Sequence, residues 1–197
     1  MYKFRKESML YGKKEEVKKL GGANEIYLHR NKHYLIVNVF LEKKEAEKTL
    51  ERIIDEFPDA GVLRLHTNSF SKSAKKKIIG DFEIKNSLKR ITSISSNIFD
   101  LQIEFLSKDN ETDNVTALVS KHKLESATIL SGITRVEESV AKIIASHIEI
   151  NLLYYEEFFE KYYTQIENRA YLLNNLAVKL ALNQVKMINN LSVSGKY

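Results

Sequence analysis

The sequence predicts an α+β fold: a two-layer sheet module of element order βαββαβ, followed by a long helical segment or a helical hairpin. Apolar runs typical of strands alternate with amphipathic stretches between residues 25 and 120. From Ile133 to Ser194 the chain has neither proline nor glycine, which favours helix. We therefore expect a basic arm over residues 1–24, the α/β module over 25–120 and a helical assembly segment over 121–197.

The first 24 residues are basic and end in the pair Gly21 and Gly22. Residues 1–20 carry seven Lys and Arg against three Asp and Glu, which is most of the excess behind the net charge of +5. Such an arm could contact phosphates or an anionic lipid surface. The alternative is an ordinary solvated terminus.

The first half of the module is predicted as a hairpin and a helix. Residues 25–30 and 33–41 flank a short turn and predict two strands. Residues 34–40 are almost continuously apolar, which is typical of a strand covered on both faces. Residues 43–57 place apolar side chains at helical spacing, and Pro58 ends that helix.

The second half of the module is predicted as four strands and one helix. Residues 61–67 and 76–82 indicate strands, and residues 84–95 indicate a short helix. Residues 99–106 alternate apolar and polar side chains with the period of a half-buried strand, and residues 115–119 form a last short one.

The last 30 residues carry more apolar surface than one small sheet can cover. A heptad-like seam recurs at spacings of four and three: Ile166, Ala170, Leu173, Ala177, Leu180, Gln184, Met187 and Leu191. Val178, Leu182 and Val185 form a second stripe beside it. Two apolar sides need two partners, which favours self-association or insertion into an assembly. A hairpin that folds back on itself near Asn174 and Asn175 is the alternative.

Aromatic pairs recur every four residues in the stretch before that seam. They are Tyr154, Tyr155, Phe158, Phe159, Tyr162 and Tyr163. On a helix each step of four turns by about 40°, so the rings cover roughly half its circumference. With Leu173, Leu180 and Met187 we expect them to form an assembly interface or a core belt, although they could also stack on sugars or bases.

The sequence predicts no enzyme, no cofactor and no metal site. There is no cysteine, and no nucleophile motif or phosphate-binding glycine loop is present. His29 and His33 have metal-ligand spacing but fall on predicted strands, where that spacing has no such meaning. His147 lies among isoleucines and is expected to be packed.

A lysine-rich stretch in the middle of the chain could attract anions. Its basic residues are Lys72, Lys75, Lys76, Lys77, Lys85, Lys89 and Arg90. Together with the basic arm it supports an alternative function, a cytoplasmic nucleic-acid-binding protein. The other interpretation is a solvated loop rim.

Two segments resemble the SPOR (sporulation-related repeat) domains. Residues 33–50 are similar to that family's first strand and helix, with Phe40, Glu45, Ala46 and Leu50 at matching places. Residues 76–82 are similar to its second half, where a strand ends in Gly-Pro-Phe before another helix. The resemblance covers about residues 33–106 and implies the βαββαβ fold and binding of peptidoglycan glycan strands. On this chain the ligand surface would contain Asn38, Lys76, Lys77 and Phe82.

We expect a non-enzymatic binding and assembly protein, a SPOR-like module joined to a helical oligomerisation segment in a cell envelope or another large complex. Its partners would be proteins, further copies of itself or peptidoglycan glycan, with nucleic acid less favoured. No stretch reaches the roughly 18 apolar residues of a membrane-spanning helix. The compartment stays open: cytoplasmic as the sequence stands, or periplasmic if a signal peptide has been removed.

Overall fold

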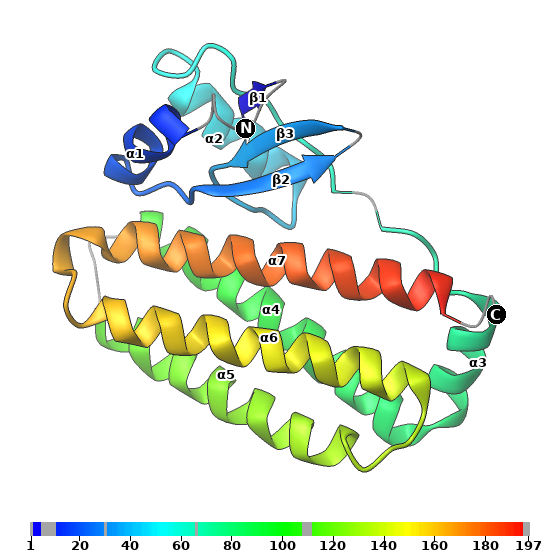
Figure 1. Ribbon diagram of the computed structural model, residues 1–197. Helices are drawn as coiled ribbons and strands as arrows, with labels where there is room; N and C mark the ends of the chain where they lie inside the picture. Colours follow the sequence, from blue (N-terminus) through cyan, green and yellow to red (C-terminus); the bar gives the residue numbers. More distant parts are fainter. Residues whose placement is uncertain (1, 5–10, 30, 66, 108–111, 195–197) are drawn as a thin grey trace.

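The protein is mostly helical, as the computed structural model in Figure 1 shows. The structure describes residues 2–4, 11–29, 31–65, 67–107 and 112–194. About 71% of the described residues are helical, and they contain one three-stranded sheet. The predicted βαββαβ module is therefore wrong: a small sheet covers one side of a helical bundle.

Four long helices form that bundle. They are α4 (Phe82–Ser107), α5 (Thr112–Ile133), α6 (Ser139–Tyr162) and α7 (Arg169–Val193), with the short 3-10 helix η2 (Ile166–Asn168) leading into the last. Each helix begins a few residues after the preceding one ends, so successive helices run antiparallel. α7 returns to lie beside α4 and closes the bundle.

One hydrophobic core runs through the bundle. Each helix contributes side chains that are almost completely buried, for example Ile98 from α4, Ile129 from α5, Ile144 from α6 and Leu173 from α7. Along each helix the buried side chains recur at spacings of three and four, so one stripe of each helix faces inward. The bundle therefore covers the apolar stripes of its own helices.

The sheet is antiparallel with strand order β1-β3-β2. It consists of β1 (Tyr2–Phe4), β2 (Glu25–His29) and β3 (Lys32–Ile36), the last at its centre. Tyr27 of β2 pairs with Tyr34 of β3. The predicted hairpin is confirmed, and part of the predicted basic arm, residues 2–4, forms the edge strand.

Strand β3 is covered on both of its faces. Tyr34 and Ile36 pack with Ala23 and with Val178 of α7. Leu35 points to the other side, where it packs with Val17 of α1 (Tyr11–Lys19) and with Phe57, which follows α2 (Lys43–Ile53). This confirms the interpretation of the apolar run for residues 34–36, but the predicted strand ends early, because residues 37–40 have no regular structure. The predicted helix that begins at Lys43 is also confirmed.

Four segments that were predicted as strands are not strands. Residues 61–65 and 67 have no regular structure, and residues 76–82 lie in α3 (Lys72–Gly80) and at the start of α4. Residues 99–106 are helical in α4, and residues 115–119 are helical in α5. The predicted domain boundary after residue 120 consequently falls inside a helix.

Residues 84–95 were predicted as a helix and lie in α4, but buried polar residues interrupt the apolar period of α4 and α5. Ser87, Ser95 and Gln102 of α4 and His122 and Ser126 of α5 are all buried. They occupy seam positions where an apolar residue would have revealed the helical period. Without them, the remaining Phe, Ile and Val residues show a local alternation that resembles a strand.

The predicted helical segment after Gly132 is a hairpin of α6 and α7. Its turn lies at residues 163–168, not near Asn174 and Asn175. Both asparagines are buried within α7, where the side chain of Asn174 donates a hydrogen bond to the backbone oxygen of Gly21 at 2.5 Å. They help to seat the N-terminal residues on the bundle.

Candidate functional site

The strongest candidate surface is the junction of α3 and α4, which we call the α3–α4 corner. We define it by seven residues: Lys72, Lys75, Lys76, Ile79, Phe82, Lys85 and Lys89. The two helices are separated by Asp81, whose backbone is extended. Each helix begins with its own cap, because Ser71 Oγ accepts from the Ala74 amide and Asp81 Oδ1 accepts from the Ile84 amide, both at 3.0 Å.

Helix α3 is amphipathic in an unusual way. Ala74 and Ile78 are buried against the bundle. The opposite face carries three lysines with Ile79 in their midst, because residues 72, 75, 76 and 79 fall within about 100° at 100° per residue. Ile79 is 77% exposed there. An isoleucine is thus held in solvent among ammonium groups.

Phe82 continues this pattern at the start of α4. Its ring is 81% exposed. Lys85 and Lys89 follow one and two turns later on the same stripe, and both are exposed. Ile79 and Phe82 are three residues apart, so their Cα atoms lie within about 11 Å of each other. Two exposed apolar residues therefore lie close together along the chain at the junction of the helices.

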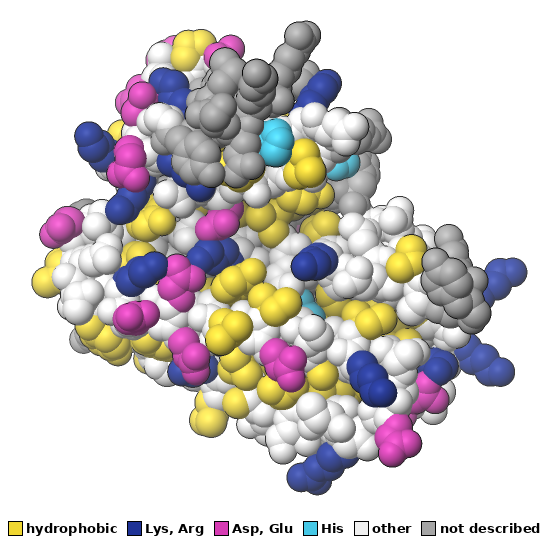
Figure 2. Space-filling view, viewed as in Figure 1, with side chains coloured by type: hydrophobic (Ala, Val, Ile, Leu, Met, Phe, Trp, Pro, Cys, Tyr) yellow, Lys and Arg dark blue, Asp and Glu magenta, His cyan; other side chains and the backbone are white. Residues whose placement is uncertain are grey.

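The lysines of the corner are available for a partner. Within the described part of the chain none of the five forms an ion pair. Their neighbours differ: Lys77 pairs with Glu138, and Arg90 Nε lies 3.1 Å from Glu125 Oε1. Figure 2 shows basic side chains projecting from the edge of the molecule where α3 lies in Figure 1.

The residues predicted to bind a ligand do not come together as one site. Lys76 and Phe82 belong to the α3–α4 corner, and Lys77 lies beside it on α3, where it pairs with Glu138. Asn38 instead accepts a hydrogen bond from Gln102, which follows Phe82 by 20 residues along α4. That separation corresponds to about 30 Å of helix. The sheet face that was expected to bind glycan therefore has no counterpart in this fold.

Most of the residues predicted for assembly are core residues of the bundle. Six of the nine are buried: Tyr155, Phe158, Tyr162, Leu173, Leu180 and Met187. Tyr154 and Phe159 are partly buried, and Tyr163 is 63% exposed. The apolar stripes exceed what the sheet covers, as expected, but α4 and α5 supply the missing partners. Most of the aromatic side chains of this belt therefore belong to the core of the bundle.

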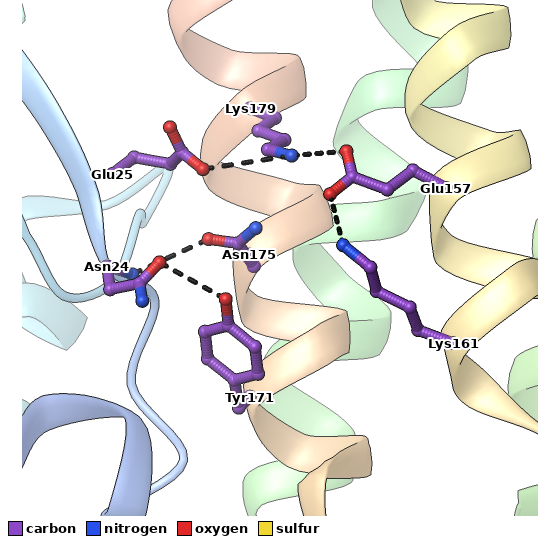
Figure 3. A network of polar contacts seen from close by, with 7 residues as sticks. All are labelled: Asn24, Glu25, Glu157, Lys161, Tyr171, Asn175 and Lys179. Carbon is purple, nitrogen blue, oxygen red and sulfur yellow. Dashed lines mark hydrogen bonds and ion pairs between the residues drawn. The ribbon is translucent and has the colours of Figure 1, made fainter. Parts of the chain in front are cut away.

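A polar network joins the sheet to the bundle (Figure 3). The ammonium of Lys179 on α7 lies 2.5 Å from Glu157 Oε2 of α6 and 3.8 Å from Glu25 Oε1 of β2. Lys161 Nζ contacts the other oxygen of Glu157 at 2.7 Å. Burial alone would raise the pKa of Glu157, but the hydrogen bonds from Lys161 and Lys179 outweigh it and lower the pKa.

Asn24 extends the same network one residue before β2. The Tyr171 hydroxyl donates to Asn24 Oδ1 at 3.2 Å, and the backbone N–H of Asn24 donates to Asn175 Oδ1 at 3.5 Å. Burial raises the pKa of the Tyr171 phenol, so it stays protonated and can keep donating. All these contacts are internal, which gives the network a structural role.

The four histidines that the structure describes do not gather into a metal site. Among the described residues, no group of three or more His, Asp or Glu side chains gathers as metal ligands. His29 and His33 lie on adjoining strands of the hairpin, and His122 and His147 are buried in the bundle. Burial lowers the pKa of both buried imidazoles, which keeps them neutral near pH 7.

No helix in the described ranges is both long enough and apolar enough to cross a bilayer.

Ile79 is the one residue of the α3–α4 corner that the sequence analysis did not single out. Its segment was predicted as a strand, so its place among the lysines was hidden. The capping sequence that begins at Ser71, with Ala74 and Ile78 four residues apart, was the available sign of a helix.

Comparisons with protein-family models, with curated proteins and with solved structures found no match for this chain. The resemblance to SPOR domains thus has no support beyond its short motifs, and the helical fold departs from the βαββαβ order that it implied. What the protein does must be argued from its own residues.

Proposed function

We propose that the chain is a non-enzymatic binding protein that attaches to an anionic membrane surface through the α3–α4 corner. One observation carries the proposal. Two large apolar side chains, Ile79 and Phe82, are mostly exposed, on the same two helices as five lysines that form no ion pair with any described residue. A lipid interface satisfies both groups at once, because it offers a hydrophobic layer just beneath a negatively charged one.

The expected binding is moderate and reversible. Moving an exposed Ile or Phe side chain out of water is worth about 1.5–3 kcal/mol when burial is complete. Each lysine near an anionic leaflet adds about 1 kcal/mol. The lysine contribution is screened by salt, whereas the apolar one is not. Attachment should therefore need anionic lipid and weaken as the ionic strength rises.

Nucleic acid is the second candidate, since the same lysines could contact phosphates and Phe82 could stack on a base. Two features favour the membrane. Ile79 has no aromatic face with which to stack, and the guanidinium of Arg90, the group best suited to base recognition, is engaged by Glu125. The corner is thus better matched to a surface that takes up apolar side chains.

Vesicle flotation tests the proposal. Vesicles of phosphatidylcholine alone should leave the protein in solution, whereas vesicles that also contain phosphatidylserine should carry it upward at low salt. The triple variant K72Q/K75Q/K76Q and the double variant I79S/F82S should each reduce the floated fraction severalfold. All substituted side chains are solvent-exposed, so the fold should persist, which circular dichroism can verify.

Matched controls lie elsewhere on the surface. K19Q/K44Q/K121Q removes the same charge from exposed positions outside the corner, and L124S/L153S removes two exposed leucines. Both should float like the unchanged protein. Failure to float with anionic vesicles at low salt would overturn the proposal, and a gel shift with oligonucleotides in the same buffer would then favour the nucleic-acid alternative.

A further inference from the structure

A second surface feature is a groove between α6 and α7, which we call the α6–α7 groove. Its volume is about 390 Å³, and its lining shares no residue with the α3–α4 corner. Ile143 and Ile150 of α6 and Met187 of α7 give it apolar walls. Figure 2 shows apolar side chains gathered along the face where these two helices lie side by side. Its volume is within the range of small-molecule sites.

The floor of the groove is polar and held in place by hydrogen bonds. His147 lines it and is only 4% exposed. Asn183 Nδ2 donates to the backbone oxygen of His147 at 3.0 Å and to Asn151 Oδ1 at 2.8 Å. With its oxygen engaged, Asn151 turns its amide nitrogen to His147 Nε2 at 3.1 Å.

This arrangement fixes which imidazole nitrogen carries the proton. An amide NH₂ can only donate, so Nε2 must accept and the neutral ring carries its hydrogen on Nδ1. In the described part of the chain Nδ1 has no hydrogen-bond partner. A buried donor without an acceptor costs about 1–3 kcal/mol, and a ligand oxygen would recover that cost.

The charge around the groove has one sign. Lys142 of α6 and Lys186 of α7 line it, and both are exposed. None of the residues that line it is acidic. Neither lysine forms an ion pair with any described residue. Two exposed ammonium groups thus flank a cleft with aliphatic walls, and a buried imidazole whose Nδ1 has no partner among the described residues lines it.

We propose that the α6–α7 groove binds a small organic anion with an unbranched apolar body, of the class of medium-chain carboxylates. The aliphatic chain would lie along Ile150 and Met187, and the carboxylate would contact Lys142, Lys186 and the Nδ1–H of His147. This site is separate from the proposed membrane surface and does not depend on it. Burial keeps His147 neutral at pH 7, which leaves Nε2 free to accept from Asn151.

Octanoate is the probe that tests the site. Its addition should shift the NMR signal of the Met187 methyl group and leave the methyl signals of the other methionines unchanged. Octanol has the same chain without charge, and inorganic phosphate has charge without a chain. Both should bind at least tenfold more weakly than octanoate, because each satisfies only one half of the groove.

Two variants test binding in the groove and distinguish a loss of binding from a loss of folding. K142Q/K186Q changes only exposed side chains and should weaken octanoate about tenfold or more. H147Q should weaken it as well, and urea unfolding will show whether that variant is folded at the concentration used. I79S/F82S, the corner variant, should bind octanoate normally, so failure of one proposal is distinguishable from failure of the other.

The proposal would be overturned by any of three results. The first is an unshifted Met187 methyl signal with octanoate in large excess. The second is equal affinity for octanol, which would make the groove merely apolar. The third is an undiminished affinity of K142Q/K186Q, which would place the carboxylate elsewhere.

Discussion

The most informative single residues are the polar ones inside the bundle. His147, Asn151 and Asn183 are each at least nine-tenths buried and bond to one another across α6 and α7. Burying such groups without partners would be costly, so their mutual hydrogen bonds constrain how the two helices slide and rotate. They therefore help to fix the register of this helix pair.

His147 makes folding sensitive to pH. Burial lowers the pKa of its imidazole to about 4, against an ordinary value of about 6.5. Between these values the unfolded chain binds a proton that the folded chain excludes, so the free energy of unfolding falls as the pH falls below 6.5. We expect a loss of about 2 kcal/mol between pH 7.5 and 5, measured by urea unfolding.

The variant H147Q removes this proton and should show a smaller loss over the same pH interval. His122 contributes with the same sign, since burial lowers the pKa of its imidazole too, so part of the dependence should remain. If H147Q keeps the full pH dependence, the imidazole of His147 is not the titrating group.

Among the elements, α4 shows why sequence pattern misjudged the middle of the chain. Ile84, Ile91 and Ile98 recur every seven residues and are all buried. Residues 84–95 were predicted as a helix, but Gln102, also buried, lies at the next seam position within residues 99–106, which were predicted as a strand. A polar residue at a helix seam interrupts the apolar period on which a prediction depends. The hairpin and α2 were predictable because their apolar positions are uninterrupted.

The connection between α1 and β2 depends on a close approach at Gly22. A Cβ atom there would lie 2.7 Å from Val37 Cγ1 and 2.8 Å from Val17 Cγ1. G22A should therefore destabilise the protein by about 1–3 kcal/mol through overpacking, as measured by urea unfolding. G12A is the matched control, because nothing lies within 4 Å of a Cβ atom at that position of α1.

G12A should be neutral or stabilising by up to about 1 kcal/mol, since alanine is the better helix former. Equal effects of the two substitutions would show that the contact at Gly22 does not limit the packing of α1 against the sheet.

On the scale of the whole molecule, the sheet is held between two layers of helices. Its inner face packs on α7 through Val178, and its outer face is covered by α1 and by Phe57. The polar network around Lys179 adds ion pairs to this contact. Because Lys179 touches both β2 and α6, it links the N-terminal layer to two different parts of the chain.

We expect K179M to loosen the sheet from the bundle. The substitution leaves the carboxylates of Glu25 and Glu157 partly buried with one fewer cation, at a cost of about 1–3 kcal/mol. Native-state hydrogen exchange should show faster exchange of the β2 and β3 amides, with the core amides of α5 much less affected. K13M, which removes an exposed i,i+3 pair on α1, should change neither set. Uniform acceleration in all elements under K179M would contradict this role.

The sequence by itself determined the hairpin, the helix that begins at Lys43, the helical run after Gly132 and the lysine stretch, because each is encoded by residues close together in the chain. Tertiary structure alone decided which partners cover the aromatic belt, and it placed His147 beside Asn183. Those outcomes depend on contacts between helices that are distant in sequence. No local period records them, because buried polar residues interrupt the pattern where the helices meet.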